Sequence, residues 1–318
     1  MKTSRTILRI CAATLFLAPS TWAEMPADLI KAGHADDAIA QLEKGGPQDA
    51  AAYNLLCRAY YQVRNWDRGI AACEKAVSME PNNGVYHLWL GRVYGEKADS
   101  VSFFSAASWA GKTRTEFENA VRLAPDNVEA RTNLAEYYFE APGFMGGGKD
   151  KAEGQAQLLD KLSPAAAHWV RAKLAEKRKD FTAAENEYRA AIQASNDGAV
   201  AWLDLASFFR KQNRFGDMED AINHAVAAPK DHPEVLVESA DMLIKAGRNF
   251  PLATQLLRRY LDSSSKSEDA PAFRAYYLLG TVLEKQGDKK SAAEQYSKAL
   301  ALAKSYSPAR DALNRVSH

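Results

Sequence analysis

Cysteine is scarce in this sequence, with 3 among 318 residues, and neither sign of charge is in excess, since 41 Lys and Arg face 40 Asp and Glu. So few cysteines exclude a framework built on disulfides. A formal charge of +1 gives no electrostatic reason to expect a nucleic-acid partner. With 18 Gly, 12 Pro and 47% hydrophobic residues, the chain is neither collagen-like nor wholly disordered. The composition therefore indicates an ordinary folded protein.

Long apolar runs are also missing, except near the N-terminus. Residues 1–9 carry three positive charges and no negative ones, residues 10–18 are apolar, and Ala23 precedes the acidic Glu24. This arrangement is typical of a secretory leader, so we expect residues 1–23 to be a signal peptide that is cleaved after Ala23. A retained anchor is the alternative, but a membrane-spanning helix needs roughly 20 apolar residues. We predict a periplasmic or secreted chain with no membrane insertion after leader removal.

Motifs for catalysis and metal binding are absent from the sequence. The six His are scattered, and no His-Glu-x-x-His, Cys-x-x-Cys or Gly-x-Ser-x-Gly pattern occurs. Residues 143–149 nearly form a phosphate loop, but Asp150 stands where the Ser or Thr that holds Mg²⁺ belongs. We therefore predict no catalytic site, no metal and no cofactor. An enzyme or enzyme accessory acting on cell-envelope or thiol substrates is the alternative.

A recurring pattern begins at Ala50. Its first copy has Tyr53, Leu56 and Cys57, then a polar break, then a second run that includes Gly69. The spacings of three, four and seven residues predict helices. Small residues let two helices cross closely, and aromatic side chains then fill the space between one pair and the next. Later copies of the leading stretch are Leu90-Gly91 with Tyr94, Leu134-Ala135 with Tyr138, Leu205-Ala206 with Phe209, and Leu279-Gly280 with Leu283.

These residues resemble the tetratricopeptide repeat family, whose unit is a 34-residue helix-turn-helix. The resemblance implies an all-α fold, a right-handed superhelical solenoid of about seven such units, and we expect it to be elongated. The segment from Glu140 to Lys149 is similar to a loop in exported bacterial tetratricopeptide proteins of unassigned role. We expect the units over residues 50–83, 84–127, 128–164, 165–198, 199–232, 233–272 and 273–306.

The chain after the leader is expected to have three parts. Residues 24–49 are expected to form a degenerate leading half-repeat, residues 50–306 the array, and residues 307–318 a capping helix at the C-terminus. The second and third units exceed 34 residues, so we expect insertions near residues 98–107 and 141–150.

Insertions between helices map to one edge of an array, and that edge often binds partners. Apolar side chains on it either cover a small satellite core or form a binding lip. The residues of this expected loop edge are Phe103, Phe104, Phe144 and Met145.

The concave wall of such an array, lined by its first helices, commonly holds extended peptides in this family. We therefore predict an exported, non-catalytic scaffold that binds a peptide or a partner protein in this groove. Arg58 and Arg92 are expected to lie one above the other and, with Asn54, to suit a carboxylate. The expected groove residues are Asn54, Arg58, Tyr61, Arg92, Phe139, Trp169, Lys173, Lys177 and Arg210.

Cys57 and Cys73 are the only cysteines after the leader, and both fall in the first full unit. If the hairpin closes near residues 64–66, they lie on the facing sides of its two helices. A disulfide then requires their Cα atoms to be about 4.4 to 6.8 Å apart. Two small buried cysteines without a bond are the alternative, and the sequence leaves both open.

Overall fold

The structure is a computed structural model that describes residues 25–227 and 232–317. The expected signal peptide, residues 1–23, lies outside the described residues, and so do the side chains of Phe103 and Phe104. The regular elements within the described ranges are all helical. In chain order they are α1 (Pro26–Ala32), α2 (Ala35–Glu43), α3 (Ala50–Gln62), α4 (Trp66–Met79), α5 (Gly84–Ser100), α6 (Phe103–Leu123), α7 (Val128–Glu140), the 3-10 turn η1 (Gly143–Met145), α8 (Lys149–Leu162), α9 (Pro164–Lys177), α10 (Phe181–Ala194), α11 (Ala199–Lys211), α12 (Phe215–Ala227), α13 (Glu234–Ala246), α14 (Phe250–Asp262), α15 (Ala272–Lys285), α16 (Lys289–Leu302) and α17 (Ser307–Val316).

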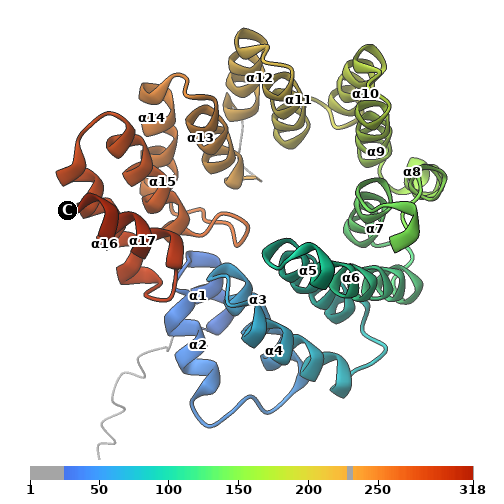
Figure 1. The fold of residues 1–318 in the computed structure, drawn as a ribbon, viewed down its shortest axis with the longest axis horizontal. Coiled ribbons are helices and arrows are strands. Elements are labelled where there is room, and N and C mark those ends of the chain that lie inside the picture. Colours follow the sequence, from blue (N-terminus) through green and yellow to red (C-terminus); the bar gives the residue numbers. More distant parts are fainter. Residues whose placement is uncertain (1–24, 228–231, 318) are drawn as a thin grey trace, which may run out of the picture.

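The helices form an array of hairpins (Figure 1). In the described part of the chain, α1 to α16 make eight consecutive pairs, each packed against the next, and α17 closes the C-terminal end. From α3 onward the pairs begin at residues 50, 84, 128, 164, 199, 234 and 272, at most one residue from the expected unit starts. The fold is an all-α superhelical repeat fold, as the sequence predicts. None of the described helices is both long enough and apolar enough to cross a bilayer.

Capping side chains explain where many of these helices begin. The capping residue accepts a hydrogen bond from the backbone N–H three positions ahead, which satisfies one of the donors left free at a helix N-terminus. Several turns within a pair also hold a residue in the left-handed region, such as Lys179 (φ 61°) and Gly287 (φ 88°). Such a residue lets the chain reverse direction at the end of a helix. The capping residues are Asp49, Asn65, Asn127, Ser163, Asp180, Asn249 and Asp288.

Small residues let the two helices of a pair cross at close range. A Cβ added to Gly91 of α5 would lie 2.6 Å from the ring of Phe117, and one added to Gly280 of α15 would lie 2.5 Å from the ring of Tyr296. The aromatic ring therefore occupies the volume that a larger side chain would need. The buried clusters are shared by neighbouring pairs, so no single interior serves the whole chain.

The array is not elongated, contrary to our expectation, because its two ends meet and form a ring around a central opening (Figure 1). One buried cluster joins Tyr60 of α3 with Phe273 of α15 and Tyr306 before α17. The backbone of Gly33 approaches the C-terminal units so closely that a Cβ there would lie 2.5 Å from the nitrogen of Ala272. Apolar residues near both ends of the chain are thus buried against each other.

Hydrogen bonds reinforce this contact, which we call the seam: α1 to α3 against residues 266–274, α16 and α17. Arg58 Nε donates to Glu268 Oε1 at 2.8 Å. Ser305 Oγ donates to Asp36 Oδ1, also at 2.8 Å. The seam is therefore both apolar and charge-matched, which favours a closed ring over an open array.

Two sequence-based expectations need correction. Residues 24–49 contain a complete short pair, α1 and α2, instead of a half-repeat. Pro26 in the first turn starts α1, a helix of 7 residues that is too short to show a repeat pattern. The extra residues near 98–107 do not form a loop, because they lengthen α5 and α6 to 17 and 21 residues. Near 141–150 the chain does leave the helix, and it forms η1 before Gly146 at φ 90°.

Candidate functional site on the inner wall

The first helices of the pairs face the central opening of the ring. In Figure 1, α3, α11, α13 and α15 lie nearer this opening than their partners α4, α12, α14 and α16. We call the surface that they form the inner wall. Between α5, α6 and α7 it is hollowed into a cavity of about 670 Å³, the α5–α7 pocket. Its lining includes Tyr61, Arg92, Glu96, Glu136 and Tyr137.

Arg58 of α3 and Arg92 of α5 lie close together, as expected, because both guanidinium groups contact the ring of Trp89. Their Cζ atoms are 5.4 Å and 4.8 Å from the centroid of the Trp89 ring. Each guanidinium already has a carboxylate partner, Glu268 for Arg58 and Glu129 for Arg92. The hydrogen bond to Glu268 is the main cause of a raised pKa at Arg58. The expectation of a free carboxylate clamp is therefore wrong, because distant residues of the same chain neutralise it.

Two of the expected groove residues lie in the interior instead. Asn54 is 4% exposed and Phe139 is 6% exposed. The Phe139 ring packs against Trp169, with centroids 5.9 Å apart. A helix turns by about 100° per residue, so an error of one position moves a side chain from the inner wall to the contact between pairs. Asn54 and Phe139 are therefore packing residues, and the groove assignment is wrong for both.

The second expected basic stretch lies on α9 and α11, and carboxylates compensate part of it as well. Lys173 Nζ is 3.9 Å from Glu176 Oε1 and 5.3 Å from the ring centroid of Trp169. Burial lowers the pKa of Lys173, because the charged form loses water contact. Arg210 lines a smaller cavity of about 220 Å³ beside Asp241.

Sequence reasoning missed Glu96 among the carboxylates of the α5–α7 pocket. Burial raises the pKa of Glu96, whose Oε1 accepts a hydrogen bond from Tyr61 Oη at 3.4 Å. The side chain of Glu136 is exposed to the pocket, and the surrounding wall displaces enough water to raise its pKa too. Glu140 differs, because it pairs with Lys177. The sequence signal for the first of these groups was its helical spacing, four residues after the expected groove residue Arg92.

Asp204 of α11 is a further carboxylate that the sequence did not indicate. Burial raises its pKa to about 6, although Lys173 and a hydrogen bond from Trp169 act in the opposite direction. Asp204 lies in the wall of a cavity of about 480 Å³ that also includes Trp169 and Thr132. The inner wall thus combines paired charges with partly buried carboxylates.

The other expected residues are placed as follows. Phe144 is 78% exposed at η1. Met145 is half-buried, and its carbonyl oxygen accepts a hydrogen bond from Tyr137 Oη at 2.7 Å. Cys57 and Cys73 form a disulfide that joins α3 to α4, with Cα atoms 5.2 Å apart. Among the described residues, no group of three or more His, Cys, Asp or Glu side chains could hold a metal ion.

Several proteins of known structure are similar to this chain. Yeast Tom70 has a similar structure, with a TM-score of 0.54 and 16% identity over 89% of this chain, which spans 58% of the Tom70 chain. A tetratricopeptide repeat protein from Parabacteroides merdae gives a TM-score of 0.43 at 15% identity over 85% of this chain and 99% of its own. The Cut9–Hcn1 structure gives a TM-score of 0.42 at 12% identity, over 92% of this chain and 54% of the matched chain. Among curated proteins, no sequence matches the chain.

Family comparison identifies the repeats themselves. Residues 28–84 and 170–233 match one profile described as a tetratricopeptide repeat, and residues 273–306 match a second. These segments cover the first pairs, a middle portion and the last full pair of the ring. Sequence profile, helix pairing and small-residue crossings agree, and the chain belongs to the tetratricopeptide repeat family.

Proposed function

We propose that this protein is an exported scaffold that holds a peptide, or a segment of a partner protein, against the inner wall of its ring. The α5–α7 pocket carries the proposal. It combines a volume of about 670 Å³ with the rings of Tyr61 and Tyr137 and with four carboxylates, of which Glu96 and Glu136 form no ion pair among the described residues. Pockets that join apolar surface with a few polar groups are the usual binding sites of proteins.

The chemistry of this pocket favours a ligand that donates hydrogen bonds. Carboxylates accept hydrogen bonds and do not donate them when ionised. An extended peptide has backbone N–H groups to offer, and its apolar side chains can cover the tyrosine rings. The amide of Asn133, which also lines the pocket, is already engaged within the chain: its Nδ2 donates to the Glu129 carbonyl oxygen at 2.7 Å, and its Oδ1 accepts from Arg92 Nε at 3.5 Å.

Site-specific photo-cross-linking tests the proposal in the native cell envelope. A photoreactive amino acid at Glu136 faces the pocket, and the same amino acid at Lys75 is exposed on α4, away from the lining of the pocket. We expect a cross-linked protein partner from position 136 and none from position 75. Equal products from both positions, or none from position 136, would contradict binding on the inner wall.

Export is proposed from the sequence of residues 1–23 and from the disulfide Cys57–Cys73, which an oxidising compartment sustains. Cell fractionation followed by N-terminal sequencing tests this part. The expected result is a periplasmic or secreted protein that begins at Glu24. A chain that keeps residues 1–23 in the cytoplasmic fraction would exclude it.

A further inference from the structure

A second cavity of the molecule lies in the seam, where the first units meet the last. It has a volume of about 380 Å³, and we call it the seam pocket. One side is formed by α3, α4 and α5, and the other by Glu238 of α13, residues 268–274 and Tyr306. An open tetratricopeptide array would not contain this pocket, because its walls come from opposite ends of the chain.

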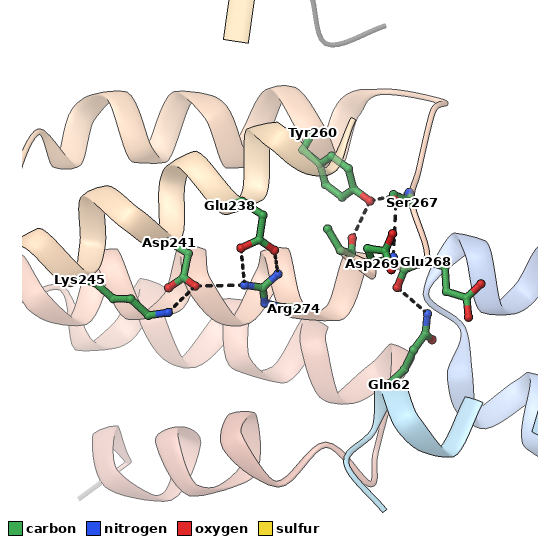
Figure 2. A network of polar contacts seen from close by, with 10 residues as sticks. Gln62, Glu238, Asp241, Lys245, Tyr260, Ser267, Glu268, Asp269 and Arg274 are labelled. Carbon is green, nitrogen blue, oxygen red and sulfur yellow. Dashed lines mark hydrogen bonds and ion pairs between the residues drawn. The ribbon is translucent and has the colours of Figure 1, made fainter. Parts of the chain in front are cut away.

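Gln62 gives the seam pocket an unusual polar group. Its side chain is buried, with 8% of the residue exposed, and it lines the pocket. Figure 2 shows its Nε2 directed at the Glu268 carbonyl oxygen, a hydrogen bond of 3.0 Å, and the same Nε2 donates to the Ile30 carbonyl oxygen at 3.1 Å. Among the described residues, the Oε1 atom accepts no hydrogen bond. A buried acceptor without a donor is costly, so this atom suits a ligand that donates one.

The charges of the seam pocket favour a cationic ligand. Two of its carboxylates are committed to the chain's own cations, Glu268 to Arg58 and Glu238 to Arg274. Figure 2 shows the fork of hydrogen bonds between Arg274 and Glu238 beside the pocket. Asp269, by contrast, has an exposed side chain in the pocket wall, with no hydrogen bond to a cation in the described chain.

Glu96 is the other carboxylate of the seam pocket that forms no such ion pair, and Arg64 is the one lining cation outside the pairs among the described residues. Loss of water contact raises the pKa of Glu96 and of Asp269, against the opposing effect of Arg64 on Glu96 and of Arg92 on Asp269; the like-charged Asp99 and Glu268 add smaller contributions. Both carboxylates would therefore gain from a cation brought by a ligand.

Aromatic rings complete the wall. Trp66, Trp89 and Tyr61 line the pocket, and the Tyr61 ring stands edge-on to both indoles, with centroids 5.6 Å apart in each case. Arg58 and Arg92 already lie over Trp89. The indole of Trp66 is therefore the surface that remains for a further planar cation.

We propose that the seam pocket receives an arginine side chain of the partner protein, whose guanidinium donates to Gln62 Oε1 and to the carboxylate of Asp269. A guanidinium carries five donors in a planar fork, so it can serve an amide oxygen and a carboxylate together while it stacks on an indole. This inference rests on the proposed function, because the partner supplies the arginine. It adds a second site that adjoins the α5–α7 pocket, because Tyr61 and Glu96 line both.

Titration of the purified protein with N-acetylarginine amide tests the inference. Binding is followed by NMR of the indole N–H resonances, because Trp66 and Trp89 line the pocket. We expect a saturable shift with the arginine compound and at least about tenfold weaker binding of the uncharged citrulline analogue. Equal binding of the two compounds, or no binding of the arginine compound, would overturn the proposal.

Two variants make the test specific. Asp269→Asn removes a charge from the pocket without removing a seam contact, since the hydrogen bond of this residue to Ser267 is made by its backbone N–H. We expect it to bind the arginine compound about tenfold more weakly. Asp262→Asn, at the end of α14 and outside the pocket lining, is the matched control and should bind like the original protein. Unchanged affinity in Asp269→Asn would overturn the assignment.

The result also separates this inference from the proposed function. A partner cross-linked through position 136, together with no binding of the arginine compound, would leave the scaffold standing and overturn the seam pocket as an arginine site. Specific binding of the arginine compound with no cross-linked partner would support the chemistry of the pocket and contradict the scaffold.

Discussion

The imidazole of His87 in α5 lies between two hydrogen-bond acceptors in the interior of the α5–α6 pair. The residue is 6% exposed, its Nδ1 lies 2.5 Å from Glu116 Oε2, and its Nε2 lies 2.9 Å from the Pro81 carbonyl oxygen. Both contacts favour the protonated ring. The hydrogen bond to Glu116 is the largest cause of the raised pKa of His87, against the opposing effect of burial.

A pH dependence of stability follows from this residue. Because the pKa of His87 is raised on folding above the ordinary value of about 6.5, the folded chain holds the proton more tightly than the unfolded chain. The stabilisation is complete below about pH 6.5 and is lost as the pH rises through the raised pKa.

We expect the free energy of unfolding to fall over that range, and His87→Gln to remove this part of the fall. Urea unfolding at a series of pH values measures it, with His224→Gln, which removes an exposed histidine, as the control. An identical pH profile for His87→Gln and the original protein would refute the assignment.

At the scale of elements, the crossings of α5 with α6 and of α15 with α16 depend on a glycine, which has no Cβ. Gly280→Ala places a methyl group 2.5 Å from the ring of the buried Tyr296, and the interior has no space to absorb it. We expect the free energy of unfolding to fall by about 1–3 kcal/mol, the usual cost of overpacking.

Gly111→Ala in α6 is the matched control for this substitution. Nothing lies within 4 Å of the added Cβ, so the alanine should raise stability by about 0.5–1 kcal/mol through its helix propensity. Thermal unfolding of both variants measures the contrast. Stabilisation by both substitutions would show that helix propensity, and not the crossing, decides the outcome.

The disulfide between α3 and α4 is a second property of a single pair. Its cysteines are 16 positions apart, and in the chain-entropy account a loop of this size stabilises the folded state by about 3 kcal/mol. We expect Cys57→Ser with Cys73→Ser to lower the free energy of unfolding by up to that amount. Mass measurement of the exported protein with and without reductant tests the bond itself. If the exported protein carries two free thiols, the disulfide is absent, and the two cysteines stabilise the pair only through the packing of their small side chains.

At the scale of the whole molecule, the closed ring depends on the seam. Arg58→Ala with Asp36→Ala removes the contacts to Glu268 and to Ser305 while the apolar part of the seam stays in place. A half-buried hydrogen bond between charged groups, such as that of Arg58 with Glu268, is worth about 1.5–3 kcal/mol, and the exposed contact of Asp36 is worth less. We therefore expect partial opening and a larger radius of gyration. Small-angle X-ray scattering measures this change.

Arg171→Ala serves as the control for the seam variant. It breaks contacts of similar kind to Asp160 and Glu153, but these join the neighbouring helices α8 and α9 and lie away from the seam. Its scattering curve should match that of the original protein. If the seam variant also keeps the original radius of gyration, the polar contacts do not hold the ring closed.

The sequence alone indicated the helices, the pairs and nearly all of the pair boundaries. The reason is that these features depend on residues close together in the chain, such as Asn127 capping the helix that follows it, or Gly91 facing Phe117 across one hairpin. It also placed Arg58 and Arg92 side by side, because equivalent positions of adjacent repeats stack.

Only the tertiary structure decided whether the array stays open or closes. Each pair turns slightly relative to the last, and the sum over eight pairs brings residues 210 positions apart, Arg58 and Glu268, into contact. No local pattern encodes that sum. The same long-range contacts settled the charge of the inner wall, since an arginine that is free in an open solenoid is neutralised once the ends of the chain meet.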